Sequence, residues 1–194
     1  VGGMAPISAT SFYPTKPLGC YGDGGAILTD NDEIADAVRT LRSHGRQGTG
    51  DVAVRNGITG RLDTLQAAVL LSKLTIFEEE LERRDQVARR YDAALTGKVG
   101  VQKRPAGYFS ANAIYTITVE DRDALKAALD AQSIGNAFFY RLALHQHPAF
   151  AEAPKRPLPV SEKFASTVIS LPMHPDLTAA EVDRVIAAVV AAVS

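Results

Sequence analysis

The segment SFYPTKPLG, residues 11–19, places Lys16 between two prolines and continues through CYGDGG into the apolar AIL at 26–28. The proline rings fix φ on either side of this lysine, and the glycines that follow permit φ values above zero. The loop is therefore stiff, and it presents its side chains in defined directions. We interpret Lys16 as a candidate reactive amine that holds an aldehyde as a Schiff base, with an ordinary solvated loop lysine as the alternative.

The same segment resembles the cofactor-lysine motif of the DegT/DnrJ/EryC1/StrS family of sugar aminotransferases, whose members commonly read S-F-F/Y-P-x-K-x-L-G-x-x-G-D-G-G-A. The resemblance continues through RLDTLQAA at 61–68 and SLPMHP at 170–175. Family members carry the lysine motif near the middle of a longer chain, so this sequence resembles their C-terminal half. The fold implied is α/β: the C-terminal part of a PLP-dependent, aspartate aminotransferase-like fold, with a partial large domain and a small α/β domain.

The resemblance implies that Lys16 forms a Schiff base with pyridoxal 5'-phosphate and then moves a proton between the donor's Cα and C4′ of the cofactor. It implies that the hydroxyl of Ser11 binds the cofactor phosphate, and a short hydroxyl side chain suits a phosphate oxygen. Thr15 lies where relatives contact the sugar substrate. The alternatives are an ordinary turn serine and a threonine that caps the turn.

A second motif, GITGRLD at 57–63, corresponds to the family's G-x-N-x-R-x-D. The family's asparagine reaches across a dimer interface to the partner's cofactor phosphate, and Thr59 stands in its place. Threonine keeps a hydroxyl donor but loses the reach and the amide. Arg61 is retained and is expected to bind the phosphates of a nucleotide sugar; a structural pairing with Asp63 or with a helix end is the alternative.

The C-terminal part departs further from the family pattern. The family's His-Tyr-Pro triplet, whose His and Tyr lie near the sugar, is here Phe139, Tyr140 and Arg141. Tyr140 is retained as an expected substrate contact, but Phe139 cannot donate a hydrogen bond and Arg141 brings a charge where proline is expected. The substrate preference is therefore expected to be shifted or lost. In SANAIYTI at 110–117, Asn112 stands where relatives carry a large ring. His145 lies in LHQHP, which resembles the family's L-H-x-Q-P, and is expected beside the substrate or in a structural role.

No metal site is expected. His145 and His147 are two residues apart, but no cysteine, aspartate or glutamate stands near them at ligand spacing, and Glu152 alone does not complete a set.

Composition excludes several classes. With 194 residues, 46% of them hydrophobic and 22% charged, the chain can bury a sizeable core. A formal net charge of −1 does not indicate binding to nucleic acid or to an anionic membrane. Cys20 is the only cysteine, so neither an intrachain disulfide nor a thiolate metal cluster is expected, which fits a reducing cytoplasm. The apolar run 185–193 is shorter than the ~20 residues of a membrane span, and no signal peptide is expected.

Hydrophobic periodicity predicts alternating strands and helices. We expect a buried strand at 26–29, helices at 32–43, 63–95, 121–132 and 179–193, further strands at 113–119 and 136–140, and a long loop at 44–60. The corresponding domains are the C-terminal part of the large cofactor-binding domain at 1–80, a bridging helix at 81–95 and a small α/β domain at 96–194.

The resemblance therefore implies transfer of an amino group from glutamate to a keto group of a nucleotide-linked sugar, in the biosynthesis of bacterial surface polysaccharides or antibiotic sugars. A cytoplasmic homodimer with shared active sites is expected. Dehydratases of the family carry histidine in place of the lysine, so Lys16 favours aminotransfer.

The alternative is a non-catalytic fragment or a binding module. The family's pyridine-binding aspartate, its stacking ring and its phosphate-binding helix come from the N-terminal half, and neither Asp23 nor Asp63 stands at the position of that aspartate.

Overall fold

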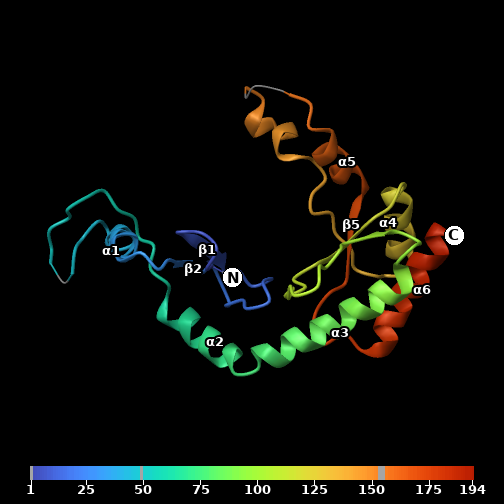
Figure 1. Cartoon of the computed structure of the whole chain (residues 1–194), viewed down its shortest axis with the longest axis horizontal. Coiled ribbons are helices and arrows are strands. Elements are labelled where there is room, and N and C mark those ends of the chain that lie inside the picture. Colours follow the sequence, from blue (N-terminus) through green and yellow to red (C-terminus); the bar gives the residue numbers. More distant parts are fainter. Residues whose placement is uncertain (1, 49, 153–155) are drawn as a thin grey trace. The chain divides into compact units, whose positions relative to one another are not determined.

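The computed structural model describes residues 2–48, 50–152 and 156–194 (Figure 1). It contains two compact units, one extending to Glu78 and the other running from Glu79 to Ser194. None of the helices in the described ranges combines the length and the apolar character needed to cross a bilayer.

The first unit begins with a two-stranded antiparallel sheet. Strand β1 (Ser8–Ser11) pairs with β2 (Gly25–Leu28), and Ser11 lies opposite Gly25. The predicted strand at 26–29 is therefore present, but the expectation that it is buried is wrong. Ile27 is 47% exposed and Leu28 is 39% exposed, because they face no packed layer among the described residues.

Helix α1 (Asp32–Leu41) follows the sheet, where the sequence predicts a helix. Asn31 caps it by accepting a 3.0 Å hydrogen bond from the backbone N–H of Ile34, which satisfies one of the free donors of the first turn. The predicted long loop comes next and is held by two isolated backbone bridges, Ser43–Thr59 and Arg46–Ala53.

The helix predicted at 63–95 is two helices, α2 (Thr64–Leu74) and α3 (Phe77–Leu95), so the prediction of one continuous helix is wrong. At the break, the N–H groups of Thr75 and Ile76 donate to the carbonyls of Ser72 and Lys73, a tightened i→i−3 pattern. Both residues are β-branched and are weaker helix formers than the leucine and lysine before them.

The second unit is built on a three-stranded antiparallel sheet in the order β3 (Gly100–Val101), β4 (Tyr115–Thr118), β5 (Val168–Leu171). Helices α4 (Arg122–Ala131) and α6 (Ala179–Val193) were predicted from periodicity and are confirmed, as is strand β4. Together with α3, they enclose the core with the sheet; its fully buried side chains include Tyr91, Leu95, Ile117, Leu125, Leu129, Ile169, Val182 and Val189.

The predicted strand at 136–140 is wrong. Only Ala137 pairs with the sheet, exchanging hydrogen bonds of 3.2 and 2.8 Å with Ser170 on β5. The chain then leaves the sheet and runs through two short 3₁₀ turns, η1 (Leu144–Gln146) and η2 (Pro148–Phe150), before helix α5 (Pro159–Thr167).

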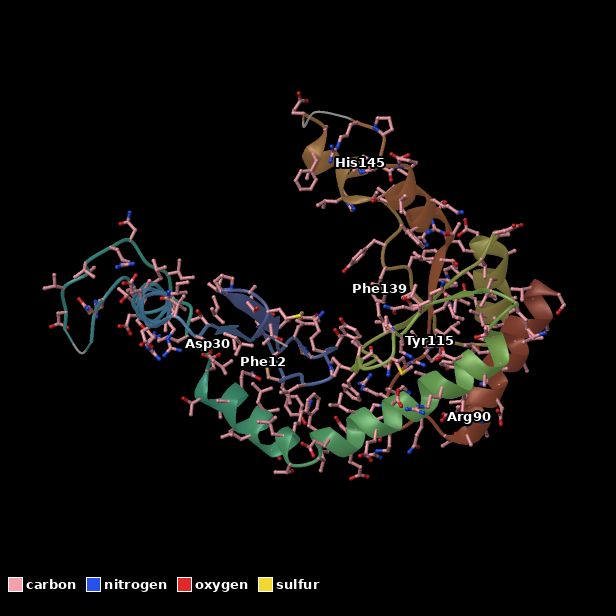
Figure 2. The ribbon with its side chains drawn as sticks, viewed as in Figure 1. Phe12, Asp30, Arg90, Tyr115, Phe139 and His145 are labelled. Atoms are coloured by element: carbon pink, nitrogen blue, oxygen red, sulfur yellow. The ribbon has the colours of Figure 1, made fainter. Side chains whose placement is uncertain are left out.

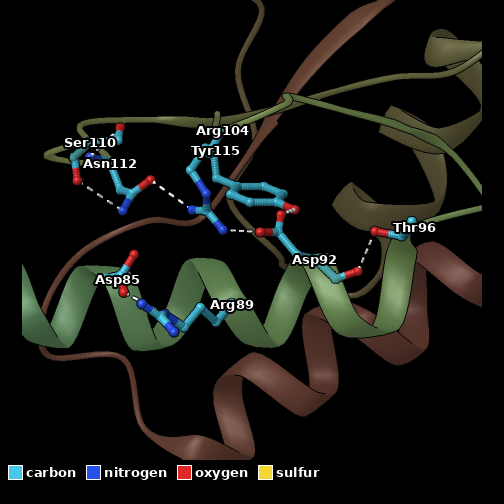
Figure 3. A network of polar contacts seen from close by, with 8 residues as sticks. All are labelled: Asp85, Arg89, Asp92, Thr96, Arg104, Ser110, Asn112 and Tyr115. Atoms are coloured by element: carbon cyan, nitrogen blue, oxygen red, sulfur yellow. Dashed lines mark hydrogen bonds and ion pairs between the residues drawn. The ribbon is translucent and has the colours of Figure 1, made fainter. Parts of the chain in front are cut away.

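A polar network joins α3 to the segment before β4 (Figure 3). Asp92 on α3 accepts from the hydroxyl of Tyr115 and from the guanidinium of Arg104, and Arg104 also donates to Asn112 Oδ1 at 3.1 Å. Asn112 is 6% exposed and has a φ of 44°, a left-handed conformation that asparagine tolerates better than most residues. The position where the family carries a large ring is thus occupied here by a buried amide within a polar network.

Candidate active site

The loop that carries Lys16 is closed at its base by the backbone of the first unit. The N–H of Phe12 donates to the carbonyl of Gly24, and the N–H of Cys20 donates to the carbonyl of Phe12, both at 2.8 Å. The first bond continues the β1–β2 register beyond Ser11 and Gly25, and the second closes the loop between residues 12 and 20. The lysine therefore projects from a loop whose ends are fixed by a sheet.

The glycines of this loop serve close packing. None of the four at positions 19–25 has a left-handed φ, so the positive φ values that glycine permits are not used there. A Cβ on Gly19 would lie 2.8 Å from the carbonyl oxygens of Tyr13 and Pro14, and one on Gly24 would lie 2.9 Å from Cys20 Sγ. Glycine is therefore required by space rather than by backbone conformation.

Lys16 is exposed on this closed loop, and its own N–H donates to the carbonyl of Tyr13 at 2.8 Å, forming a tight turn. Thr15, next to it, is also exposed. Within residues 2–48, 50–152 and 156–194, no ion pair includes the Lys16 ammonium. The amine is therefore presented on a fixed backbone.

Ser11 stands at the end of β1, immediately before the turn. Its Oγ accepts a 3.2 Å hydrogen bond from the N–H of Tyr13, so its hydroxyl proton remains to be donated to an acceptor such as a phosphate oxygen. The donor chemistry of Ser11 and the exposed amine of Lys16 both fit an aldehyde cofactor that carries a phosphate. The structure brings Ser11, Thr15 and Lys16 together on one loop.

Two residues of α2 support the far side of this loop. Gln66 Oε1 accepts from the N–H of Tyr21 at 2.7 Å, and Lys73 Nζ donates to the carbonyl of Gly19 at 2.7 Å. The Lys73 ammonium also lies 5.0 Å from the centroid of the Tyr21 ring. Sequence reasoning missed both roles, because the contacts join residues 45 and 54 positions apart.

Thr59 and Arg61 lie in the segment that leads into α2, and both are exposed. The Thr59 backbone pairs with Ser43, and its Oγ1 lies 3.4 Å from Nδ1 of His44. The first unit also has a cavity of about 1120 Å³ between β1, β2 and α1, but its lining does not include Ser11, Thr15 or Lys16.

Tyr140 and His145 line a cavity of about 470 Å³ in the second unit. Figure 2 labels Phe139 and His145, with His145 on the turn beside α5. The remaining lining is mostly apolar and comes from the segment 139–144, from η2, from α5 with the residue before it, and from the start of β5: Phe139, Leu142, Ala143, Leu144, Phe150, Leu158, Ser161, Phe164, Ala165 and Val168.

His145 is held by a carboxylate that sequence reasoning missed. Its Nε2 lies 3.0 Å from Glu162 Oε1, and the same oxygen accepts from the N–H of Leu158 at 3.0 Å. The hydrogen bond from Leu158, followed by that from His145, lowers the pKa of Glu162. Glu162 lies 17 residues after His145, which is farther apart than the short spacings by which paired site residues are recognised in a sequence. Among the described residues, no cluster of three or more metal-ligating side chains forms around this pair.

Comparison with known proteins places the chain in a family. The model of the DegT/DnrJ/EryC1/StrS aminotransferase family matches residues 1–190. A UDP-2-acetamido-2-deoxy-3-oxo-D-glucuronate aminotransferase from Pseudomonas aeruginosa is 44% identical over 186 residues, which are 95% of this chain and 51% of that protein. A dTDP-3-amino-3,4,6-trideoxy-alpha-D-glucose transaminase from Streptomyces venezuelae is 37% identical, over 97% of this chain and 51% of that protein.

Solved structures agree with this placement. A DegT DnrJ EryC1 StrS aminotransferase from Brucella abortus superposes with a TM-score of 0.91 at 50% identity, covering 95% of this chain and 50% of that one. S. venezuelae DesV, solved in complex with a ketimine intermediate, superposes with a TM-score of 0.93 at 36% identity. The match covers 98% of this chain and 52% of that one. The chain spans about half the length of these relatives. Its α/β fold is that of the corresponding half, and the chain belongs to the DegT/DnrJ/EryC1/StrS aminotransferase family.

Proposed function

We propose that these residues form part of the active site of an aminotransferase that moves an amino group, with glutamate as donor, to a keto carbon of a nucleotide-linked sugar. The observation that carries the proposal is the exposed amine of Lys16 on a loop clamped at its base and followed by space-restricted glycines. Relatives named as aminotransferases of UDP- and dTDP-linked sugars support the substrate class. Because the chain covers about half of their length, we assign the reaction to a complete polypeptide of the family type that contains these residues.

Pyridoxal 5'-phosphate, when bound, would supply the electron sink that stabilises negative charge at the donor's Cα. Lys16 Nζ would bind the cofactor aldehyde and, once released by the amino donor, would carry the proton away from Cα. Ser11 Oγ–H would donate to the phosphate. Thr59 would supply a second hydroxyl donor to the phosphate of a partner subunit in a homodimer. A preformed loop lowers the entropy cost of ordering the amine when the substrate binds, because the backbone that carries it is already fixed.

The remaining candidate residues would bind the sugar nucleotide. Thr15 stands beside Lys16, where it would contact the sugar. Arg61 offers a planar guanidinium that suits a diphosphate. In the second unit, Tyr140 offers a hydroxyl and a ring face, and His145, oriented by Glu162, offers a ring nitrogen. The first unit and α3 would correspond to the cofactor-binding domain and its bridging helix, and the rest to the small domain.

Reductive trapping tests the role of Lys16. The chain is incubated with pyridoxal 5'-phosphate, reduced with borohydride, digested and mapped by mass spectrometry. We expect the adduct to concentrate on the peptide that contains Lys16, because a lysine in a cofactor site forms the more persistent imine. The matched variant Lys16→Arg keeps the charge but cannot form an imine, so its adduct is expected only at background level.

Adducts spread over the exposed lysines in proportion to their exposure, and unchanged in Lys16→Arg, would count against the cofactor site and favour a non-catalytic role. In a complete polypeptide that transfers amino groups, Lys16→Ala is expected to abolish turnover with glutamate and a keto-sugar nucleotide.

A further inference from the structure

The segment that presents Tyr140 is irregular, yet it is fixed at three successive residues. Asn136 Nδ2 donates to Asp130 Oδ1 at 2.8 Å, which ties the segment to α4. Ala137 exchanges two backbone hydrogen bonds with Ser170 on β5. The third contact is made by the ring of Phe138, which is partly buried against the core. From Phe139 to the start of α5 at Pro159, no strand pairing holds the chain among the described residues.

Two arginines lie over the Phe138 ring. The guanidinium carbons of Arg122 and Arg141 are each 4.4 Å from its centroid, well within the range of a cation–π contact. Arg122 is itself immobilised, because its side chain is 11% exposed and its Nη1 donates to the carbonyl of Ala165 on α5. The Phe138 ring is therefore anchored by a fixed side chain of α4.

Arg141 differs from Arg122 because it is exposed. Among the residues that the structure describes, no salt bridge includes it. An exposed arginine normally samples many rotamers, so a guanidinium stacked on Phe138 connects position 141 back to position 138. Phe139 and Tyr140 lie between these two positions, with their rings packed edge to face at a centroid distance of 5.6 Å.

We propose that Arg141 is a positioning residue: by stacking on Phe138 it closes a four-residue clamp that holds Tyr140 at the wall of the cavity it shares with His145. Tyr140 is 70% exposed, so its own packing does not fix it. A proline at position 141 would restrain the chain through its fixed φ, whereas arginine leaves φ free and supplies the restraint through its side chain. The clamp explains how a charged residue is accommodated after Tyr140.

This inference rests on the proposed function only for the role given to Tyr140, so its first test does not use activity. The chain contains no tryptophan, so Tyr140→Trp introduces a single tryptophan at the position of interest, which is excited selectively at wavelengths that tyrosine does not absorb. In that background, Arg141→Ala is expected to raise acrylamide quenching about twofold and to lower the fluorescence anisotropy, because the clamp opens. Arg141→Pro is expected to restore both values towards those of the parent.

Two further variants complete the design. Phe138→Leu removes the ring while keeping an apolar side chain, and it is expected to loosen position 140 as Arg141→Ala does. Arg39→Ala removes an exposed arginine from α1, where it pairs with Asp36, and is expected to change neither signal. Unchanged quenching and anisotropy in Arg141→Ala, with a native circular dichroism spectrum, would overturn the inference.

In a complete polypeptide with aminotransferase activity, Arg141→Ala is expected to raise KM for the sugar nucleotide severalfold with kcat nearly unchanged, and Arg141→Pro to rescue KM. A fluorescence response without turnover in any variant would leave the clamp established and contradict the proposed function instead.

Discussion

The hydroxyl of Tyr115 donates a 2.6 Å hydrogen bond to Asp92 Oδ1, while Arg104 binds the other oxygen of the same carboxylate. The Asp92 side chain of α3 thus accepts hydrogen bonds from a strand residue and from a loop arginine at once (Figure 3). The Tyr115 ring also packs against Tyr91, with centroids 4.9 Å apart. The contact joins a polar network to the hydrophobic core of the second unit.

Asp92→Asn is expected to destabilise the second unit by about 1–2 kcal/mol, because it removes a charge-assisted pair that is only partly exposed. Urea denaturation followed by circular dichroism measures the change. Asp85→Asn, on the same helix, is the matched control: Asp85 pairs with Arg89, which is 76% exposed, and its loss is expected to cost about 0.3–0.5 kcal/mol. Equal effects of the two variants would show that the network contributes no more to stability than an exposed ion pair.

The buried tyrosines predict a loss of stability at alkaline pH. Burial raises the pKa of Tyr115 to about 12, and burial also raises the pKa of Tyr91. Because the folded-state pKa lies above the unfolded value of about 10, the contribution is complete below pH ~10 and is lost as the pH rises towards 12. The free energy of unfolding should therefore fall over this window, and less steeply in Tyr115→Phe. A parallel decline in both proteins would contradict the assignment.

Lys73→Met is expected to loosen residues 19–22 without unfolding α2, because methionine keeps the aliphatic stem but loses the hydrogen bond to Gly19 and the contact with the Tyr21 ring. The cost should be about 1–2 kcal/mol. Hydrogen exchange resolved to peptides measures the protection of the 12–24 loop. Lys98→Met, at an exposed position of the second unit, serves as the control and should leave that protection unchanged.

Thr59→Asn tests the departure from the family's phosphate-binding asparagine. If the residue faces a cofactor phosphate in the dimer, the longer amide should tighten the affinity for pyridoxal 5'-phosphate about tenfold, the equivalent of one added charge-assisted hydrogen bond. A fluorescence titration of a complete polypeptide measures the Kd. Thr59→Val, which keeps the shape but removes the hydroxyl, should weaken binding, and an identical Kd in all three proteins would remove Thr59 from the cofactor site.

Local signals in the sequence were sufficient for the elements with clear periodicity and caps. Helix α6 begins after Thr178, which forms a capping box with Glu181, and its apolar stripe faces the core, so its limits were predicted as observed. Helix α4 begins after its cap, Asp121, and its limits were also predicted closely. The break between α2 and α3 was not predicted, because neither glycine nor proline stands at positions 75 and 76. The hydrophobic periodicity of a helix continues through Thr75 and Ile76.

The remaining features depend on tertiary contacts, which local sequence patterns do not show. The aromatic run 138–140 has high strand propensity, but it makes no ladder pairs, and its first ring, Phe138, is instead stacked by Arg122 and Arg141. The motif located Lys16, Ser11 and Thr15 on one loop, whereas Gln66 and Lys73 became visible only once α2 was placed beside that loop. The Glu162 partner of His145 was missed for the same reason, because a separation of 17 residues carries no local signal.

Cys20 is fully buried, and its thiol lies 3.0 Å from the carbonyl of Phe12 and 3.1 Å from that of Gly22. Alkylating reagents therefore have no access to the only native sulfhydryl group while the first unit is folded. A cysteine introduced at an exposed position would be the single reactive thiol, so spin labels or fluorophores can be attached site-specifically without altering the native sequence elsewhere. Labelling of Cys20 itself would then report unfolding of the loop base.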